Sequence, residues 1–348
     1  MRQINYQLTN TIVNNLIDLE TTKCKISQLD LSDEIQTQLN KKQKKIDIFH
    51  TAHMLGLNIT LKDTEKFLVG KIDTQNDLKN KILNNFKNAI EYIRSNRYDN
   101  YVNINKDLVL HLNKLLIYSW KEPWEAKFRV GTDIDSSFDD WLTYGDQSIK
   151  TNEIEAELDN TFEWYKNNTD RINPIIRTAV TIYRLIRIIP FSNLNKLTII
   201  AICDFLLQKN EYSTITYLSV PKLFDLNQDE FKEQWEKSSN SPTGNITFWI
   251  EKFTEHIAAE FENRYKRITK QIETNKKRTH QPFLNLNKRQ LKILKYLQTI
   301  PSVKRQDYVQ MFDVSTMTAY RDLNELLKKK LIKVEGKGRA TKYSLANR

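Results

Sequence analysis

The sequence predicts a mostly α-helical protein, with a large helical body followed by a small C-terminal module of three helices and a β-hairpin. Glycine and proline are scarce, with 7 of each in 348 residues, whereas the turns of a Rossmann-type or barrel enzyme usually require more glycine. Apolar residues recur three to four positions apart through most of the body, which is the spacing of one helix face. Near the C-terminus this spacing gives way to the alternation that is typical of strands.

The first half of the body contains two clear helix faces. They are formed by Ile82, Phe86, Ala89, Ile90 and Ile93, and by Leu108, Leu112, Leu115 and Leu116. The stretch 120–144 breaks this pattern with aromatic and acidic residues, and Gly131 and Gly145 mark turns in it. We therefore expect an irregular segment with a short hairpin there.

In the second half of the body the helices resume from Asn152, and Pro174 suits the first turn of one of them. Residues 197–207 are apolar on nearly all sides, and such a helix lies in the centre of a bundle. The composition of residues 238–244 predicts a loop, and a long amphipathic helix follows from Phe248 and becomes strongly basic toward its end.

Three parts are expected from these boundaries. They are an N-terminal helical region, residues 1–75, a helical core, residues 76–278, and a C-terminal module, residues 285–348. Near residues 279–282 we place the linker into the module.

The charge is divided unevenly between these parts. The chain holds 54 Lys and Arg against 43 Asp and Glu, but residues 263–348 alone hold 22 against 6, so the body is slightly acidic. A basic tail on an acidic body is a usual signature of a nucleic-acid-binding arm. A merely solvated basic surface is the alternative.

Composition also bounds the compartment. The longest apolar run, residues 197–207, is shorter than the roughly 20 residues that a bilayer requires, so no membrane partner is expected. Residues 1–15 lack the apolar block of a secretory signal. Cys24 and Cys203 are the two cysteines, and two cannot build a disulfide framework or a four-cysteine zinc site. We expect a cytoplasmic protein.

The C-terminal module has the layout of a winged helix-turn-helix. Leucines 291, 294 and 297 mark its first helix and Tyr308, Val309 and Phe312 its second, whereas Ser315 can cap the third. Residues 332–334 and 341–345 then alternate as strands around a turn with two glycines and two cations, residues 336–339.

The polar residues of this module fit double-stranded DNA as the partner. A helix in the major groove presents its first outward residues to the base edges, and here these are Thr316, Met317, Tyr320 and Arg321. The wing offers Lys337, Arg339 and Lys342 to phosphate or the minor groove, and Lys304 and Arg305 open the second helix, where they can hold the backbone. Winged helices also mediate protein contacts, so a homodimer or another protein partner remains open.

Within the body, one loop between two helices reads Ile189-Pro190-Phe191-Ser192-Asn193-Leu194-Asn195-Lys196-Leu197. It resembles the central loop of the Fic (Fido) family, which reads H-P-F-x-D/E-G-N-G-R-x-x-R. His111 with its following leucines, Phe128-Arg129 and residues 247–253 are similar to further segments of that family. The resemblance implies a Fic-type helical bundle with a small β-hairpin flap, for which a C-terminal winged helix is a common companion.

The chemistry of the family implies roles that this loop does not fill. In the family the histidine takes a proton from the hydroxyl that attacks the α-phosphate of ATP, the acidic residue holds Mg²⁺, and glycine and arginine residues accommodate phosphate. Here Ile189 stands at the histidine, Asn193 at the acidic residue and Leu194 at a glycine. Leu197 and Ile200 stand at the arginines, whereas Pro190, Phe191 and Asn195 persist and Lys196 takes the second glycine position. The comparison implies a protein that has lost adenylyl transfer and requires no cofactor.

A regulatory segment is altered in the same way. Thr51 to Gly56 resembles the family's inhibitory helix, S/T-x-x-x-E-G/N, with Leu55 in place of the glutamate. A glutamate there binds the phosphate-clamping arginine in the family, and Leu197 offers no such partner.

The leading hypothesis is therefore a Fic-fold protein without catalysis that acts, like a transcription regulator, through DNA. One alternative is a divergent Fic nucleotidyltransferase that uses ATP and Mg²⁺, with His111 or Tyr183 as base, and another is a pure interaction protein with an acidic partner. Asn195, Lys196 and Arg187 are the candidates for a nucleotide or another anion. His50 and His53 have metal-like spacing, but we predict no metal site because no third ligand lies near them in the sequence.

Overall fold

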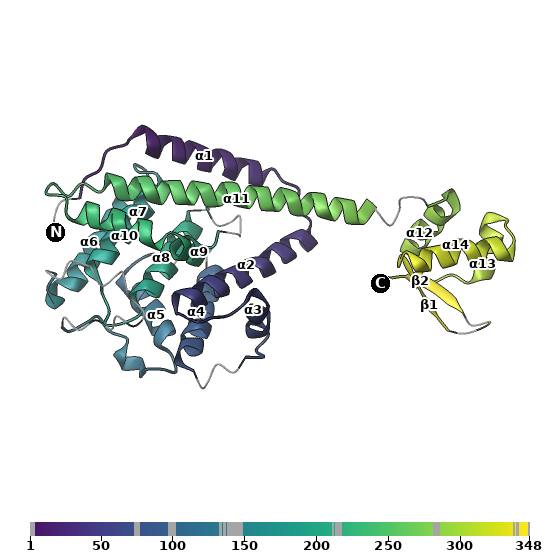
Figure 1. The fold of residues 1–348 in the computed structure, drawn as a ribbon, viewed down its shortest axis with the longest axis horizontal. Helices are drawn as coiled ribbons and strands as arrows, with labels where there is room; N and C mark the ends of the chain where they lie inside the picture. The colour runs from purple at the N-terminus through teal and green to yellow at the C-terminus, as the bar shows by residue number, and fades with distance from the viewer. Residues whose placement is uncertain are drawn as a thin grey trace. The chain divides into compact units, whose positions relative to one another are not determined.

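A computed structural model describes residues 4–72, 77–96, 102–131, 134, 137, 149–210, 212, 218–280, 286–336, 338 and 341–346. The chain forms two compact units, residues 1–268 and 269–348. Figure 1 shows a mostly helical chain, and the described residues include one two-stranded sheet. The expected fold class is thereby confirmed. None of the described helices combines the length and the apolarity that a bilayer crossing requires.

The body is built from helices. In chain order they are α1 (Asn10–Ser27), α2 (Asp33–Met54), α3 (Leu61–Leu68), α4 (Leu78–Ser95), α5 (Lys106–Ile117), the short 3-10 turns η1 (Pro123–Glu125) and η3 (Thr151–Glu153), α6 (Ile154–Asn167), α7 (Pro174–Ile188), α8 (Asn195–Lys209), α9 (Val220–Leu226), α10 (Gln228–Ser239) and α11 (Thr247–His280). Of residues 120–144, where a hairpin is expected, residues 120–131, 134 and 137 are described and contain no strand, and the others lie outside the described residues. Helix α11 extends into the expected linker, residues 279–282, as far as His280.

Helix α8 is the centre of the body. Its residues from Asn195 to Gln208 are all buried, and it packs against α4, α5, α7 and α9. Leu197, Ile200 and Leu206 are each at most 1% exposed, as expected for a helix that is apolar on nearly all sides.

Helix α7 begins where the sequence predicts, because Pro174 occupies its first turn and the Asn173 side chain accepts a hydrogen bond from the Ile175 amide at 2.8 Å. It is tied to α11 by the buried indole of Trp249, whose Nε1 donates to the Ala179 carbonyl at 2.8 Å. Helices α7 and α8 are joined by residues 189–194, so the packing of both helices fixes the loop between them.

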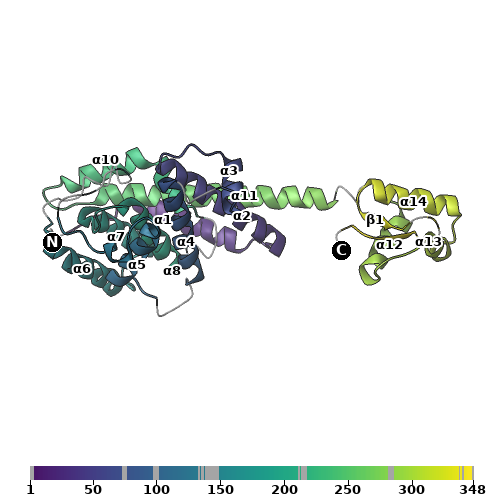
Figure 2. The same ribbon diagram turned by 90° about the horizontal axis from the view of Figure 1, so that it is seen from below.

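The N-terminal segment runs beside α11, as both views show (Figures 1 and 2). Thr9 Oγ1 donates to Glu251 at 2.6 Å and Asn15 Nδ2 to Thr254 at 3.1 Å. The expected loop begins with residue 240, just after α10, and its Gly244 carbonyl accepts from the Asn5 amide at 3.1 Å. The segment from Asn5 to Asn15 is therefore part of the body's packing.

The C-terminal unit contains α12 (Lys288–Thr299), α13 (Arg305–Phe312), α14 (Thr316–Lys328), β1 (Ile332–Glu335) and β2 (Lys342–Leu345). The strands are antiparallel, with Ile332 opposite Leu345 and Glu335 opposite Lys342. Val303 forms a further bridge to Tyr343. The unit has its own core, which consists of Ile293, Leu294, Leu297, Val303, Tyr308, Ala319, Leu323, Leu326, Ile332 and Tyr343.

Candidate functional site

Helix α14 presents the four residues that the sequence assigns to DNA bases on one exposed side. Ser315 caps the helix, since its Oγ accepts from the Thr318 amide at 3.2 Å. Ala319, Leu323 and Leu326 are fully buried on the inner side. Thr316, Met317, Tyr320 and Arg321 are all exposed, with Met317 61% and Tyr320 46% accessible.

The turn before α14 has the geometry of a helix-turn-helix. Helix α13 ends at Asp313, which adopts a left-handed φ of 47° and whose amide bonds to the Val309 carbonyl. Aspartate tolerates this conformation better than most residues, because its short polar side chain can bond locally. The chain can therefore leave α13 and enter α14 within three residues.

A buried carboxylate that the sequence analysis missed orients α14 within its unit. Asp322 accepts hydrogen bonds from Asn287 Nδ2 at 2.8 Å, Arg289 Nε at 2.9 Å and the Tyr308 hydroxyl at 2.9 Å. Burial alone would raise the pKa of Asp322, but these bonds outweigh it and hold the pKa below its usual value. The sequence feature that could have drawn attention to this cluster is the Asn287-x-x-Gln290 capping box at the start of α12. Its glutamine also donates to Glu325 on α14 at 2.9 Å.

The predicted backbone contacts are placed in part. Lys304 is exposed at the cap of α13, and the Arg305 guanidinium lies 5.3 Å from the centre of the Tyr320 ring on α14. Lys342 is exposed on β2. Lys337 and Arg339, which the sequence predicts at the tip of the wing, lie outside the described residues, whereas Gly336 and Gly338 have positive φ, which glycine adopts without strain.

In the body, the loop between α7 and α8 has two residues in the left-handed region. Ile189 ends α7 with φ 43° and ψ 72°, and Leu194 precedes α8 with φ 56° and ψ 28°. This conformation is costly for a branched side chain and is typical of glycine. Leu194 occupies the position at which the Fic pattern has glycine, so the loop retains the backbone conformation that a glycine favours without the glycine itself.

Several hydrogen bonds hold this loop. The Asn195 side chain accepts from the Phe191 amide at 3.0 Å and donates to the Phe191 carbonyl at 2.9 Å. Arg129, which is 6% exposed, donates from Nε to the Ile189 carbonyl at 2.7 Å, and its own amide donates to the Pro190 carbonyl at 2.9 Å. Burial lowers the pKa of Arg129. Asn195 and Arg129 thus have structural roles on the loop backbone.

The predicted loop residues are mostly inaccessible. Ile189, Pro190, Phe191, Asn193, Asn195, Lys196 and Leu197 are all buried. A cavity of about 330 Å³ lies beside the loop and is lined by Ser192 and Asn193, by Lys121 and Lys127, and by other residues that do not include Asn195, Lys196 or Arg187. Asn195 is 0% exposed and Lys196 2%, whereas Arg187 is half-buried on α7.

The two residues considered as alternative bases also lie apart from this cavity. Tyr183 is 2% exposed and packs against Trp235 and Trp249. His111 is on the exposed side of α5, with its ring 4.8 Å from that of Tyr92, and partial burial of the ring together with the nearby Lys114 charge lowers its pKa. Neither residue lines the cavity beside Asn193.

His50 and His53 meet a third group that is distant in sequence. Asp225 on α9 lies 2.7 Å from His50 Nδ1 and 2.8 Å from His53 Nδ1. Burial opposes ionisation of Asp225, yet these contacts hold its pKa below the usual value. Among the described residues, no group of three acidic, histidine or cysteine side chains is arranged to hold a metal ion. Thr51, expected in an inhibitory helix, is buried near the end of α2 and donates to the Asp47 carbonyl.

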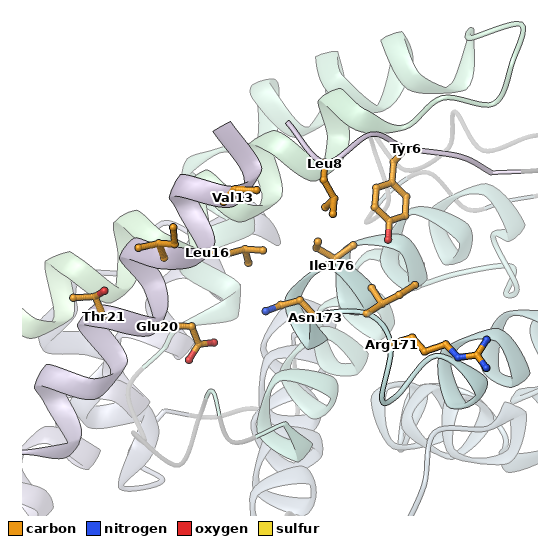
Figure 3. A pocket seen from close by; sticks show the side chains of 11 residues that line it. Tyr6, Leu8, Val13, Leu16, Glu20, Thr21, Arg171, Asn173 and Ile176 are labelled. Carbon is orange, nitrogen blue, oxygen red and sulfur yellow. The ribbon is translucent and has the colours of Figure 1, made fainter. Parts of the chain in front are cut away.

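A second hollow of the body is a mostly apolar groove of about 460 Å³ (Figure 3). It lies between the N-terminal segment with α1 and the start of α7. Its walls include Tyr6, Leu8, Val13, Leu16, Asn173 and Ile176. None of the residues that the sequence analysis singled out for function lines it.

The family model matches within the second unit, whereas the solved structures match most or nearly all of the chain. Residues 289–341 match the DeoR-like helix-turn-helix domain family, and no curated protein matches the sequence. Among solved structures, a Fic family protein from Desulfovibrio desulfuricans G20 superposes with a TM-score of 0.63 at 14% identity over 99% of each chain. A Fic domain containing signaling protein from Bacteroides thetaiotaomicron VPI-5482 gives 0.58 at 17% identity, over 76% of this chain and 98% of the other. Fic-1 from C. elegans gives 0.57 at 14% identity, over 74% and 72%. The body therefore has the fold of Fic proteins, and the C-terminal unit contains a DeoR-like helix-turn-helix domain.

Proposed function

We propose that this protein binds double-stranded DNA through its C-terminal unit, with α14 in the major groove, and acts in the manner of a transcription regulator. The observation that carries the proposal is the exposed side of α14, where Thr316, Met317, Tyr320 and Arg321 follow a capped start. In helix-turn-helix proteins the first outward residues of the second helix of the motif contact the base edges. The rigid attachment of α14 through Asp322 supports this reading, because base contacts require a fixed helix.

The charge of the unit favours a polyanionic partner. Residues 285–348 hold 15 Lys and Arg against 5 Asp and Glu. Phosphate neutralisation by such cations supplies most sequence-independent affinity for DNA. The proposed phosphate or minor-groove contacts are Lys304, Lys342 and the wing residues Lys337 and Arg339. Arg305, whose guanidinium lies 5.3 Å from the centre of the Tyr320 ring, is proposed as a further one.

Binding of the full chain to a pool of random duplexes, followed by selection, tests this proposal. On the selected duplex, Arg321→Ala is expected to weaken binding by roughly 1 to 3 kcal/mol, because a guanidinium on a base edge is lost, and to weaken binding to random duplex less. Lys62→Ala is the matched control, since it removes one exposed positive charge from the body instead. Failure of the unaltered chain to retain any duplex, even at low salt, would refute DNA binding.

We further propose that the body no longer transfers AMP. Ile189 cannot accept a proton, and it stands where the Fic pattern has its general base. Its side chain is 2% exposed, and the neighbouring Leu194 and Leu197 fill positions that the pattern reserves for a glycine and an arginine. With Asn193 at the acidic position, the catalytic base, the metal ligand and the phosphate clamp of the pattern are all replaced. This favours a structural rather than a catalytic role for the body.

Incubation with labelled ATP and Mg²⁺ tests this second proposal. The unaltered protein should modify neither itself nor added protein above a blank, and an active adenylyltransferase serves as positive control. Ile189→His alone should remain inactive, because a general base contributes about 10² to 10⁴-fold and cannot act on a nucleotide that is not held. Robust transfer by the unaltered chain would instead establish the divergent nucleotidyltransferase.

A further inference from the structure

The outward side of α14 exposes two large side chains with apolar surface, Met317 and Tyr320. Met317 is 61% exposed and Tyr320 46%, and they lie three residues apart on the same side, next to the methyl-bearing side chain of Thr316. Single exposed apolar residues are ordinary. Here two such residues lie at the capped start of a base-reading helix, in a unit with excess positive charge. This combination indicates a negatively charged partner that offers an apolar group to contact.

We propose that α14 recognises the 5-methyl groups of thymine, so that the preferred site has A·T pairs opposite Met317 and Tyr320; this inference rests on the proposed DNA binding. In the major groove, an A·T pair differs from a G·C pair partly by the thymine methyl, which apolar side chains can contact. A methionine side chain has no strong donor or acceptor for a base edge, whereas it packs well against a methyl group.

The hydrogen-bonding groups on this side of the helix are the Thr316 hydroxyl, the Tyr320 phenol and the Arg321 guanidinium. Arg321 is the group among the four that can bond guanine in the bidentate manner. The Thr318 hydroxyl lies 2.9 Å from Ser315 Oγ and belongs to the cap, so it is already engaged. A helix start with one guanine-reading residue, a methionine and the apolar ring of a tyrosine is well matched to a site that contains thymine.

The Tyr320 ring has a cationic partner within its own unit before any DNA is bound. The Arg305 guanidinium lies 5.3 Å from the Tyr320 ring centre, within the range of a cation–π contact. Arg305 begins α13, and the first helix of a helix-turn-helix crosses the phosphate backbone. One arginine can therefore hold the ring and face the backbone, which reduces the ordering that binding would otherwise require.

The test uses the full chain and the duplex that it selects from a random pool. Each thymine of the selected site is replaced in turn by deoxyuridine, which lacks only the methyl group. One or two positions should lose affinity about fourfold, the factor that burial of one methyl-sized group gives. Positions outside the selected site should lose none.

Variants assign the effect to the helix. Met317→Ala should bind the selected duplex more weakly and should no longer distinguish thymine from deoxyuridine at its position. Met311→Ala is the matched control, because this methionine is 40% exposed in the same unit but lies on α13, and it should keep the full difference. Circular dichroism melting confirms that both variants are folded.

The outcomes separate the two proposals. If the chain binds no duplex, DNA binding itself fails. If it binds a selected site tightly but deoxyuridine changes nothing at any position, or if selected sites lack thymine, thymine recognition is overturned while DNA binding stands. A difference that persists in Met317→Ala and Tyr320→Ala also overturns it, since the methyl would then be read elsewhere.

Discussion

At the scale of single residues, two branched side chains of the body, Ile189 and Leu194, have strained backbone conformations that the packing of the loop requires. Ile189 and Leu194 adopt a backbone conformation that L side chains rarely enter, and such residues each cost about 1 to 3 kcal/mol. Asn195 offsets part of this cost by bonding both polar groups of Phe191. The resemblance identified the loop, but a left-handed leucine follows from tertiary packing and could not be predicted from local sequence.

Asp204 is another residue that burial alters. It lies on α8, is 3% exposed and accepts from Gln208 Nε2 at 2.6 Å. Burial, together with the nearby Asp47 carboxylate, raises its pKa to about 6, although Arg94 opposes the change. Because the native state then binds the proton more tightly than the unfolded state, Asp204 should lower stability as the pH rises from about 4 to about 6.

Asp204→Asn should therefore stabilise the body above pH 6, by on the order of 3 kcal/mol, and the gain should disappear near pH 4. Urea unfolding of variant and parent at several pH values measures this difference. Asp225→Asn is a useful contrast, because the pKa of Asp225 is lowered and its replacement should destabilise the protein at neutral pH. A gain for Asp204→Asn that does not depend on pH would show that Asp204 does not titrate in this range.

At the scale of elements, the sequence predicted helix starts well where a capping residue or a proline marks them. Pro174 with Asn173 and Ser315 with Thr318 place helix starts directly, and the strand ends differ from expectation by a residue at most. Contacts between residues far apart in sequence were missed. Asn287 and Asp322 are 35 positions apart, and Asp225 lies 172 or more positions from its two histidines. No periodicity encodes such pairs.

The attachment of α14 makes a prediction at this scale. Asp322→Ala should destabilise the C-terminal unit by about 2 to 4 kcal/mol, because it leaves the buried Tyr308 hydroxyl without its acceptor and Arg289 without its carboxylate. The pKa of Asp322 is lowered, so its contribution should be full at neutral pH and decline as the pH falls through the folded-state pKa. Thermal melting by circular dichroism measures both effects. Asp307→Ala, on the exposed start of α13, is the control and should cost much less.

At the scale of the whole molecule, the sequence separates the two units by charge and by aromatic content. The chain forms two compact units, residues 1–268 and 269–348, and the second has a core of its own. All six tryptophans, at positions 120, 124, 141, 164, 235 and 249, belong to the first unit, whereas the core of the second contains Tyr308 and Tyr343. Tryptophan fluorescence therefore reports on the body alone.

This division predicts that the units unfold separately. Asp322→Ala should lower the midpoint of the C-terminal unit's unfolding, as measured by circular dichroism. It should leave the midpoint seen by tryptophan fluorescence unchanged, because each core excludes water independently of the other. Leu206 lies in the centre of the body and is 1% exposed. Leu206→Ala should reduce the free energy of unfolding of the body by about 2 to 5 kcal/mol and so lower the midpoint of the transition seen by tryptophan fluorescence. It should leave the affinity for duplex DNA at low temperature unchanged. If instead either substitution shifts both transitions together, the chain unfolds as one cooperative unit, and the C-terminal module cannot be treated as an independent DNA-binding domain.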